Sequence, residues 1–162
     1  MNDHVATILE QWQRERPDLD SSPMAVLGRL VRLSKHVEQV LERNFKQYNL
    51  HGGLFDVLAT LRRSGTPFCL TPTQLQTAMM LSSGATTNRI DRLEQRGLVS
   101  RQPDPNDRRG YLISLTPEGK TLIDEVVETH LTVEESLLTN LSPDEREQLA
   151  ELLAILAERL GL

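Results

Sequence analysis

The pattern of hydrophobic and polar residues predicts a mainly helical protein. Apolar residues recur every three or four positions over most of the chain, as they do in amphipathic helices. Only near residues 98–115 does the period change, with two short runs that are typical of strands. Helix starts are predicted where a capping hydroxyl precedes a proline, which occurs at Ser22-Pro23, Thr71-Pro72, Thr116-Pro117 and Ser142-Pro143.

These signals divide the chain into successive elements. A short helix ends before Pro17 and carries the apolar stripe Val5, Ile8, Leu9 and Trp12. Further helices are expected over about 23–48, 53–63, 72–80, 82–97, 116–140 and 142–160. Strands are expected at 98–101 and 111–115, joined by the polar loop 102–110. The long helix 23–48 has apolar residues on two faces, which indicates burial on more than one side.

The order helix, short helix, polar helix, strand, basic loop, strand predicts a winged helix-turn-helix. The inward positions of helix 82–97 are Ala85 or Thr86, then Ile90 and Leu93. Short polar side chains on the opposite face can reach base edges in the major groove, and small residues allow close approach of the helix N-terminus. The candidate DNA-binding residues in this helix and the loop are Ser83, Gly84, Thr86, Thr87, Asn88, Arg92, Asp107, Arg108 and Arg109.

The charge distribution favours DNA as a partner more than the total charge does. The formal net charge is -5, but residues 82–111 carry +2 and the remainder carries -7. A cationic segment on an acidic body is the footprint of a localised anion-binding face. From this pattern alone, a solvated hairpin with ordinary surface arginines remains the alternative.

Two stretches resemble the MarR family of regulators. Residues 81–99, LSSGATTNRIDRLEQRGLV, resemble its recognition helix and first wing strand, and DPNDRRG followed by LTPEG resembles its wing and the next helix start. The resemblance covers roughly residues 24–160. It implies a DNA-binding repressor that acts on a pseudo-palindromic operator in double-stranded DNA. It also implies that Arg109 enters the minor groove and that Asp107 braces the wing.

The resemblance further implies a homodimer built from the long helix and the terminal helices. The apolar stripes of the terminal helices support this, because a winged-helix core cannot cover them alone and exposed stripes would form a large apolar patch. Packing within one chain is the alternative. The expected organisation is an extension helix in 1–20, a dimerisation helix in 21–50, the winged helix-turn-helix in 51–116 and dimerisation helices in 117–162.

Residues 11–20 resemble the N-terminal extension of the urate-responsive, PecS- and HucR-like subfamily. That resemblance implies an anionic purine site whose residues here would be Trp12, Asp56, Arg89 and Arg101. An aromatic ring and guanidinium groups suit a planar anion such as urate. Each residue also has a structural alternative: Trp12 as a packing staple, Asp56 with Arg89 as an ion pair, and Arg101 as a phosphate contact. Phenolic acids or oxidants are alternative effectors.

Other classes of function have little support in the sequence. A winged-helix protein-interaction module without DNA binding is the main rival. We expect no enzyme, cofactor or metal site, because there is no nucleophile–base motif, no phosphate loop and no metal-ligand spacing among the histidines. Cys69 is the single cysteine, so no intrachain disulfide is expected and a redox switch is not favoured. Without an apolar span or a signal sequence, the chain is expected to be cytoplasmic and not membrane-bound.

Overall fold

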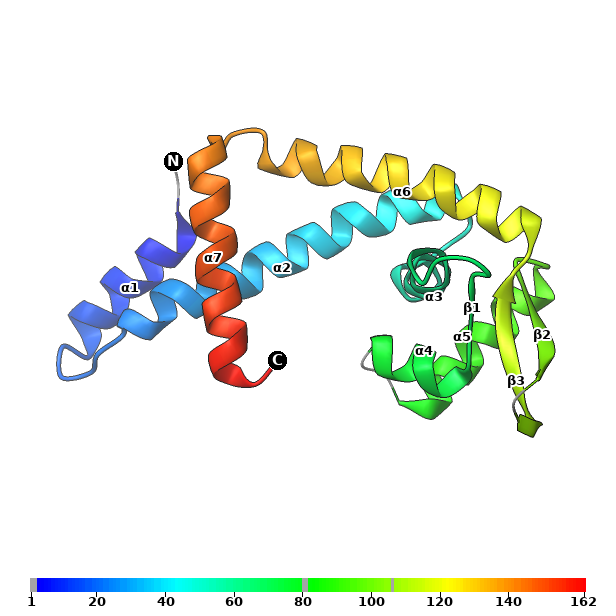
Figure 1. Ribbon diagram of the computed structural model, residues 1–162. Helices are drawn as coiled ribbons and strands as arrows, with labels where there is room; N and C mark the ends of the chain where they lie inside the picture. The colour runs from blue at the N-terminus through cyan, green and yellow to red at the C-terminus, as the bar shows by residue number, and fades with distance from the viewer. Residues whose placement is uncertain (1–2, 80–81, 106) are drawn as a thin grey trace. The chain divides into compact units, whose positions relative to one another are not determined.

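The computed structural model describes residues 3–79, 82–105 and 107–162. Within these ranges the chain forms seven helices and three strands (Figure 1). The elements are α1 (His4–Glu15), α2 (Ser22–Gln47), α3 (Gly52–Arg63), β1 (Cys69–Leu70), α4 (Pro72–Met79), α5 (Ser83–Gln95), β2 (Val99–Asp104), β3 (Asp107–Leu115), α6 (Pro117–Leu138) and α7 (Pro143–Leu160). The predicted fold class, mainly helical with a small β-wing, is confirmed.

Three of the four predicted caps are confirmed. The Thr71 hydroxyl accepts from the Gln74 N–H at 3.2 Å, and the Gln74 side chain accepts from the Thr71 N–H at 2.8 Å. Thr116 caps α6, and Ser142 caps α7 in a reciprocal capping box. Helix α2 differs because it begins at Ser22 itself. The Asp20 carboxylate accepts from the Ser22 N–H at 2.9 Å, so an aspartate takes the capping role that was predicted for Ser22.

The sheet is antiparallel and has the strand order β1-β3-β2. The two wing strands are longer than predicted, since β2 runs to Asp104 and β3 begins at Asp107. Much of the polar segment 102–110, which was predicted to be a loop, therefore belongs to the two strands. Strand β2 lies at the edge of the sheet, where a proline without an N–H costs no ladder hydrogen bond on the open side. Strand β1 was missed because two residues carry no alternation signal.

The chain divides into two compact units, Met1–Val40 and Leu41–Leu162. In the second unit, α3 lies between α6 on one side and α4 and α5 on the other (Figure 1). Its residues Val57, Leu58 and Leu61 are fully buried. They form one core with apolar residues from α4, α5, the sheet and α6, including Leu75, Ile90, Leu93, Ile113, Ile123 and Val126.

In the first unit, α1 packs against the N-terminal part of α2. Val5 is 4% exposed, and its Cγ1 lies 3.4 Å from the position that a Cβ on Gly28 would take. Asp3 caps α1 and also pairs with Arg29 of α2. Trp12, at the other end of the apolar stripe, is 41% exposed. The extra N-terminal helix predicted from the sequence is therefore present.

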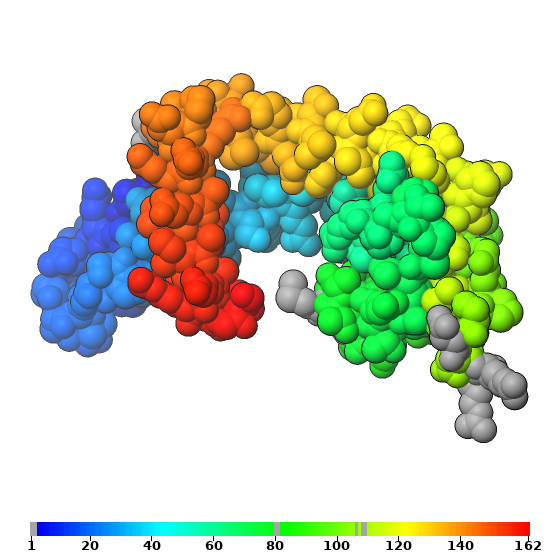
Figure 2. Space-filling model, in the orientation of Figure 1, coloured from blue at the N-terminus to red at the C-terminus, as the bar shows by residue number. Residues whose placement is uncertain are grey.

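Apolar side chains are exposed along α2, α6 and α7. In the second unit, α7 stands clear of the sheet and of α3 to α5 (Figure 2), and none of its residues is buried. Leu152 and Leu160 are each 66% exposed, and Val26, Leu27, Val31 and Leu33 of α2 are between 53% and 68% exposed. No helix in the described part of the chain is long and apolar enough to span a membrane.

Two helical glycines make a matched test of the fold. A Cβ on Gly119 would lie 1.9 Å from the Leu98 carbonyl oxygen, so α6 packs backbone to backbone against the turn before β2. Gly119→Ala should destabilise the protein by about 3 kcal/mol. Gly84→Ala in α5 meets no described atom within 4 Å and should be neutral or stabilising by up to about 1 kcal/mol. Thermal and urea unfolding would measure both, and equal stabilities of the two variants would contradict the observed packing.

Candidate nucleic-acid interface and anion site

The N-terminal half of α5 presents an uncovered polar face. Ser82 precedes the helix, and its hydroxyl accepts from the Ala85 N–H at 3.4 Å. The side chains on the outward face are exposed, and they are small or polar: Ser83, Gly84, Thr87, Asn88 and Arg92. Since no described atom lies within 4 Å of a Cβ placed on Gly84, the backbone at this end is open to close approach. This face has the composition and access that major-groove reading requires.

Thr86 does not belong to that face, and the prediction that it contacts DNA is wrong. Its side chain is 2% exposed, and its hydroxyl donates to the Ser82 carbonyl at 3.1 Å. The inward positions of α5 are therefore Thr86, Ile90 and Leu93, whereas Ala85 is half-buried. Thr86 helps to seat the start of α5 on the core.

The end of α5 is fastened to the corner between α2 and α3. The Arg96 guanidinium donates to the Asn49 carbonyl at 2.7 Å and to the Tyr48 carbonyl at 3.2 Å. Both carbonyls follow the last turn of α2, and Asn49 adopts a left-handed conformation with φ of 54°. A charged donor therefore satisfies carbonyl groups that the helix end leaves without intrahelical partners.

The wing is the hairpin of β2 and β3. Asp107 lies against Gly110, where a Cβ would come within 3.0 Å of the Asp107 carboxylate. A larger residue at position 110 would therefore require the Asp107 side chain to shift. The bracing role of Asp107 stays a prediction. The side chains of Arg108 and Arg109 lie outside the part of the chain that the structure describes.

Asp56 and Arg89 are brought together, as both the ligand hypothesis and the ion-pair alternative expect. Asp56 lies on α3 and Arg89 on α5, with 3.6 Å between Oδ2 and Nη1. Arg89 packs tightly on Gly53, where a Cβ would lie 2.6 Å from the guanidinium carbon. Arg89 Nη1 is buried and, among the described residues, has no hydrogen-bond acceptor. A guanidinium with an unused buried donor, held against a bare helix backbone, is suited to binding an anion.

The carboxyl group of Asp56 is poorly stabilised as an anion. Partial burial raises its pKa above the usual value, although Arg89, Arg63 and His130 act in the opposite direction. Its side chain is 55% exposed, so the 3.6 Å ion pair lies at the surface and contributes little to stability. An external anion would therefore displace a weak partner when it approaches Arg89.

A small aromatic cluster lies near Asp56, because its member His130 acts on the Asp56 carboxyl group. Phe45 and Phe55 stack with ring centroids 4.6 Å apart, and Phe55 lies 4.7 Å from the His130 ring. His130 Nε2 contacts Glu134 at 3.1 Å, and its Nδ1 is buried with no hydrogen-bond partner in the described residues. The cluster joins α2, α3 and α6 next to the ion pair.

Arg101 lies in a different network. Its guanidinium donates to Asp91 Oδ1 at 2.5 Å and to Glu94, both on α5. Asp91 follows Arg89 by two residues, so it points to roughly the opposite side of the helix. The structure thus joins Asp56 to Arg89 and places Arg101 in its own ion-pair group, which the sequence did not reveal.

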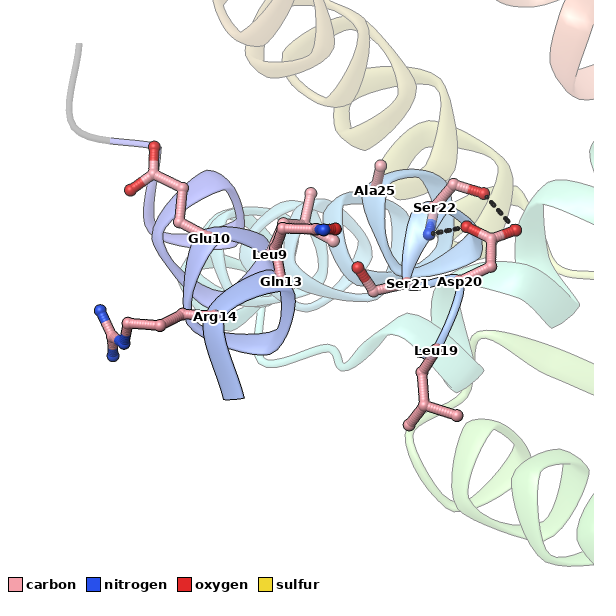
Figure 3. A pocket seen from close by; sticks show the side chains of 9 residues that line it. All are labelled: Leu9, Glu10, Gln13, Arg14, Leu19, Asp20, Ser21, Ser22 and Ala25. Carbon is pink, nitrogen blue, oxygen red and sulfur yellow. Dashed lines mark hydrogen bonds between the residues drawn. The ribbon is translucent and has the colours of Figure 1, made fainter. Parts of the chain in front are cut away.

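Trp12 belongs to the first unit, on α1, and is exposed. That unit also contains a cavity of about 660 Å³ between α1 and the segment that leads into α2 (Figure 3). Leu9, Gln13 and Ala25 line it, and Asp20 is hydrogen-bonded to Ser22 at its edge. Trp12 is not among the described lining residues.

Cys69 and the possible metal-ligating side chains were also candidates for chemistry. Cys69 is a free, half-buried thiol on β1, paired with Ser114 of β3. Among the described residues, no group of three or more His, Cys, Asp or Glu side chains could hold a metal ion.

Sequence reasoning missed the residues that position α5: Gly53, Asp91, Glu94, Arg96 and Tyr111. The Gly52-Gly53 pair at a helix start was an available signal for close approach of another side chain. No sequence signal identified the groups that accept hydrogen bonds from Arg96 and Arg101, because these groups lie on different elements from the arginines.

The geometry of α4, α5 and the wing defines a class of protein. A helix with an exposed polar face, preceded by α4 and followed by a two-stranded wing, is a winged helix-turn-helix of the DNA-binding type. Residues 53–111 match the MarR family. The HTH-type transcriptional regulator PecS of Dickeya dadantii is 43% identical over 96% of this chain and 94% of its own length. The chain belongs to the MarR family and is a transcriptional regulator of the MarR and PecS type.

Solved structures agree with this assignment. A mutant of MarR from E. coli, complexed with operator DNA, is 29% identical and has a TM-score of 0.73. The match covers 85% of this chain and 99% of that one. BpsR of Bordetella bronchiseptica, whose structure concerns regulation of its DNA binding by 6-hydroxynicotinic acid, is 27% identical with a TM-score of 0.72. That match covers 82% of this chain and 92% of that one.

Proposed function

We propose that this chain is a homodimeric repressor that binds a pseudo-palindromic operator and is released by a small planar anion, with urate or a related purine as the best candidate. The observation that carries the DNA part is the open polar face of α5 beside the wing. In such a fold the helix reads the major groove, and an arginine at the wing tip suits an adjacent narrow minor groove. The helix residues proposed to contact bases or phosphates are Ser83, Gly84, Thr87, Asn88 and Arg92, with Arg108 and Arg109 from the wing.

The anion part rests on Arg89. Its buried Nη1 has only a distant, weakly stabilised carboxylate near it, so an incoming anion gains a charge-assisted hydrogen bond. Arg89 is also part of the recognition helix, so an anion that repositions it moves the DNA-reading face. The resemblance of residues 11–20 to the urate-responsive subfamily favours a planar ring compound, and so does the regulation of BpsR by 6-hydroxynicotinic acid. Trp12 and Arg101 are proposed as ligand contacts from the resemblance alone, because Arg101 lies in a separate ion-pair group with Asp91 and Glu94.

The homodimer is supported by the uncovered apolar residues of α2, α6 and α7. Helix α7 has an amphipathic sequence, but no residue of it is buried in the single chain. A second copy would cover the exposed leucines of α7, and a stable interface of this kind buries about 1,200 Å² or more. The segments 21–50 and 117–162 are therefore the proposed dimerisation regions, around a DNA-binding segment 51–116.

The DNA contact of the wing is tested with Arg109→Ala. The operator is first isolated by selection from a random duplex library. The substitution should weaken operator binding by about tenfold to a hundredfold, because it removes a cation from the minor groove, and it should reduce the salt slope by about one. Arg14→Ala, which removes an exposed arginine of α1, is the matched control. Unchanged affinity of the Arg109 variant in mobility-shift assays would refute the wing contact, and a flat salt dependence would favour a protein-interaction module.

The homodimer is tested by sedimentation at micromolar concentration. The wild-type chain should sediment as a dimer, and its selected operator should have half-sites about 10 bp apart. Leu152→Asp should shift the protein towards monomer, because it would bury a carboxylate in the interface. Ala154→Asp, at an exposed position about 160° around the same helix from Leu152, should leave the dimer intact. A wild-type monomer, or a selected operator without a dyad, would contradict the proposal.

The ligand is tested by fluorescence and mobility shift with urate. Trp12 is the only tryptophan, so bound urate should quench its emission if Trp12 is part of the site. Urate should also release the operator, provided the moved conformation binds urate more tightly. Trp12→Phe should weaken urate binding, measured by calorimetry, and leave operator affinity within about twofold. If urate neither quenches Trp12 nor shifts the DNA complex, the effector is another compound, such as a phenolic acid.

Asp56→Asn separates two roles of the carboxylate. If Asp56 acts by repelling the bound anion, the variant should bind urate as tightly as wild type or more tightly, yet release DNA poorly. If Asp56 serves only as the partner of Arg89, the variant should melt at a lower temperature, with no change in the ratio of urate binding to DNA release. The raised pKa of Asp56 argues against the second outcome, because the folded protein disfavours the ionised carboxylate and its removal should not lower the melting temperature.

A further inference from the structure

Arg101 connects the base of the wing to the recognition helix. It follows the buried Val99 by two residues on β2, so it lies on the sheet face that packs on α5. Its guanidinium donates to Asp91 Oδ1 at 2.5 Å and to a carboxylate oxygen of Glu94. These acids are three residues apart and therefore adjoin on one edge of α5. One forked side chain thus holds two positions of the same helix edge.

The second wing strand closes the other side of this contact. The Arg101 guanidinium carbon lies 5.4 Å from the centre of the Tyr111 ring, at a cation–π distance. Tyr111 is two residues from Ile113, the register partner of Arg101 on β3, so both side chains lie on the same face of the hairpin. The Arg101 side chain is only 28% exposed. We call this group the wing clamp: Asp91, Glu94, Arg101 and Tyr111.

We propose that the wing clamp fixes the angle between the wing and the recognition helix and thereby sets how well the protein discriminates its operator from other DNA. Phosphate contacts alone bind any duplex about equally well. Discrimination requires α5 to sit in the major groove while the wing reaches the adjacent minor groove, so their relative angle matters for specific binding. Arg101 is a positioning residue in this role.

The wing clamp also bears on release by an anion, a consequence that rests on the proposed function. Two carboxylates already occupy N–H groups of Arg101. An anion can engage those groups only by displacing Asp91 or Glu94, which frees the wing from α5. Binding of the anion and closure of the wing clamp are thus mutually exclusive, and each weakens the other to the same extent.

The test compares Glu94→Gln with Glu125→Gln, an exposed glutamate of α6 outside the clamp. Affinity is measured for the selected operator and for a random duplex of equal length, at two salt concentrations. Glu94→Gln should lower the ratio of operator to random affinity by about tenfold, because a charge-assisted bond is lost. Binding to random DNA should be unchanged or slightly tighter, since a negative charge has been removed. The control should keep the wild-type ratio.

A double-mutant cycle shows whether the effect passes through Arg101. Glu94→Gln combined with Arg101→Gln should discriminate no worse than Arg101→Gln alone. Melting temperatures are measured for every variant. An unchanged ratio in Glu94→Gln would overturn the clamp. Additive losses of discrimination in the double variant would also overturn the clamp. Parallel losses of operator affinity, random-DNA affinity and melting temperature would overturn it too, because they indicate a general defect of folding.

The competition with an anion is read separately, with urate as the probe. Glu94→Gln should bind urate several-fold more tightly than wild type, because one competing carboxylate is gone. Equal urate affinities of Glu94→Gln and wild type would overturn the proposed competition. The role of the wing clamp in DNA discrimination is still tested by the ratio of operator to random affinity. If urate binds neither wild type nor Glu94→Gln, the proposed urate response is wrong. The wing clamp is then tested by DNA discrimination alone.

Discussion

The recognition helix α5 has to leave one face polar and uncovered, and the DNA-reading surface depends on how its other faces are held. Apolar contact comes from a narrow edge, formed by Thr86, Ile90 and Leu93. The other contacts that hold α5 are made by arginines. Arg89 contacts α3, and Arg96 contacts the corner after α2. Arg101 reaches α5 from the wing. The helix is thus held by a small apolar seat and by charged contacts to three different elements.

This division of labour suits a regulator. A dissolved anion cannot replace an apolar contact, but it can replace the carboxylate that pairs with an arginine. Asp56 is a weak partner, because burial raises its pKa and its distance to Arg89 is 3.6 Å. In the proposed function, an anion would shift α5 through its arginines while the core around Leu58 and Ile113 stays packed. Such a movement would require no unfolding.

Much of this fold could be predicted from the sequence. Thr71, Thr116 and Ser142 predict helix starts because their hydroxyls can cap a helix. The helical period identifies the outward face of α5. The same period could not decide between Ala85 and Thr86, because neighbouring positions on a helix differ by only about 100°. The extent of β2 was missed because Pro103 is tolerated on an edge strand. The partners of Arg96 and Arg101 could not be predicted, because they depend on tertiary packing. Arg96 contacts a corner that is distant in sequence, and Arg101 connects a strand to a helix.

If DNA and a small anion favour different positions of α5, as we propose, their affinities must be linked. Calorimetry can measure the urate affinity of the wild-type protein with and without saturating operator, and mobility shift can measure operator affinity with and without saturating urate. We expect each ligand to weaken binding of the other by the same factor, about tenfold to a hundredfold. Urate that binds with equal affinity to the free protein and to the operator complex would contradict it.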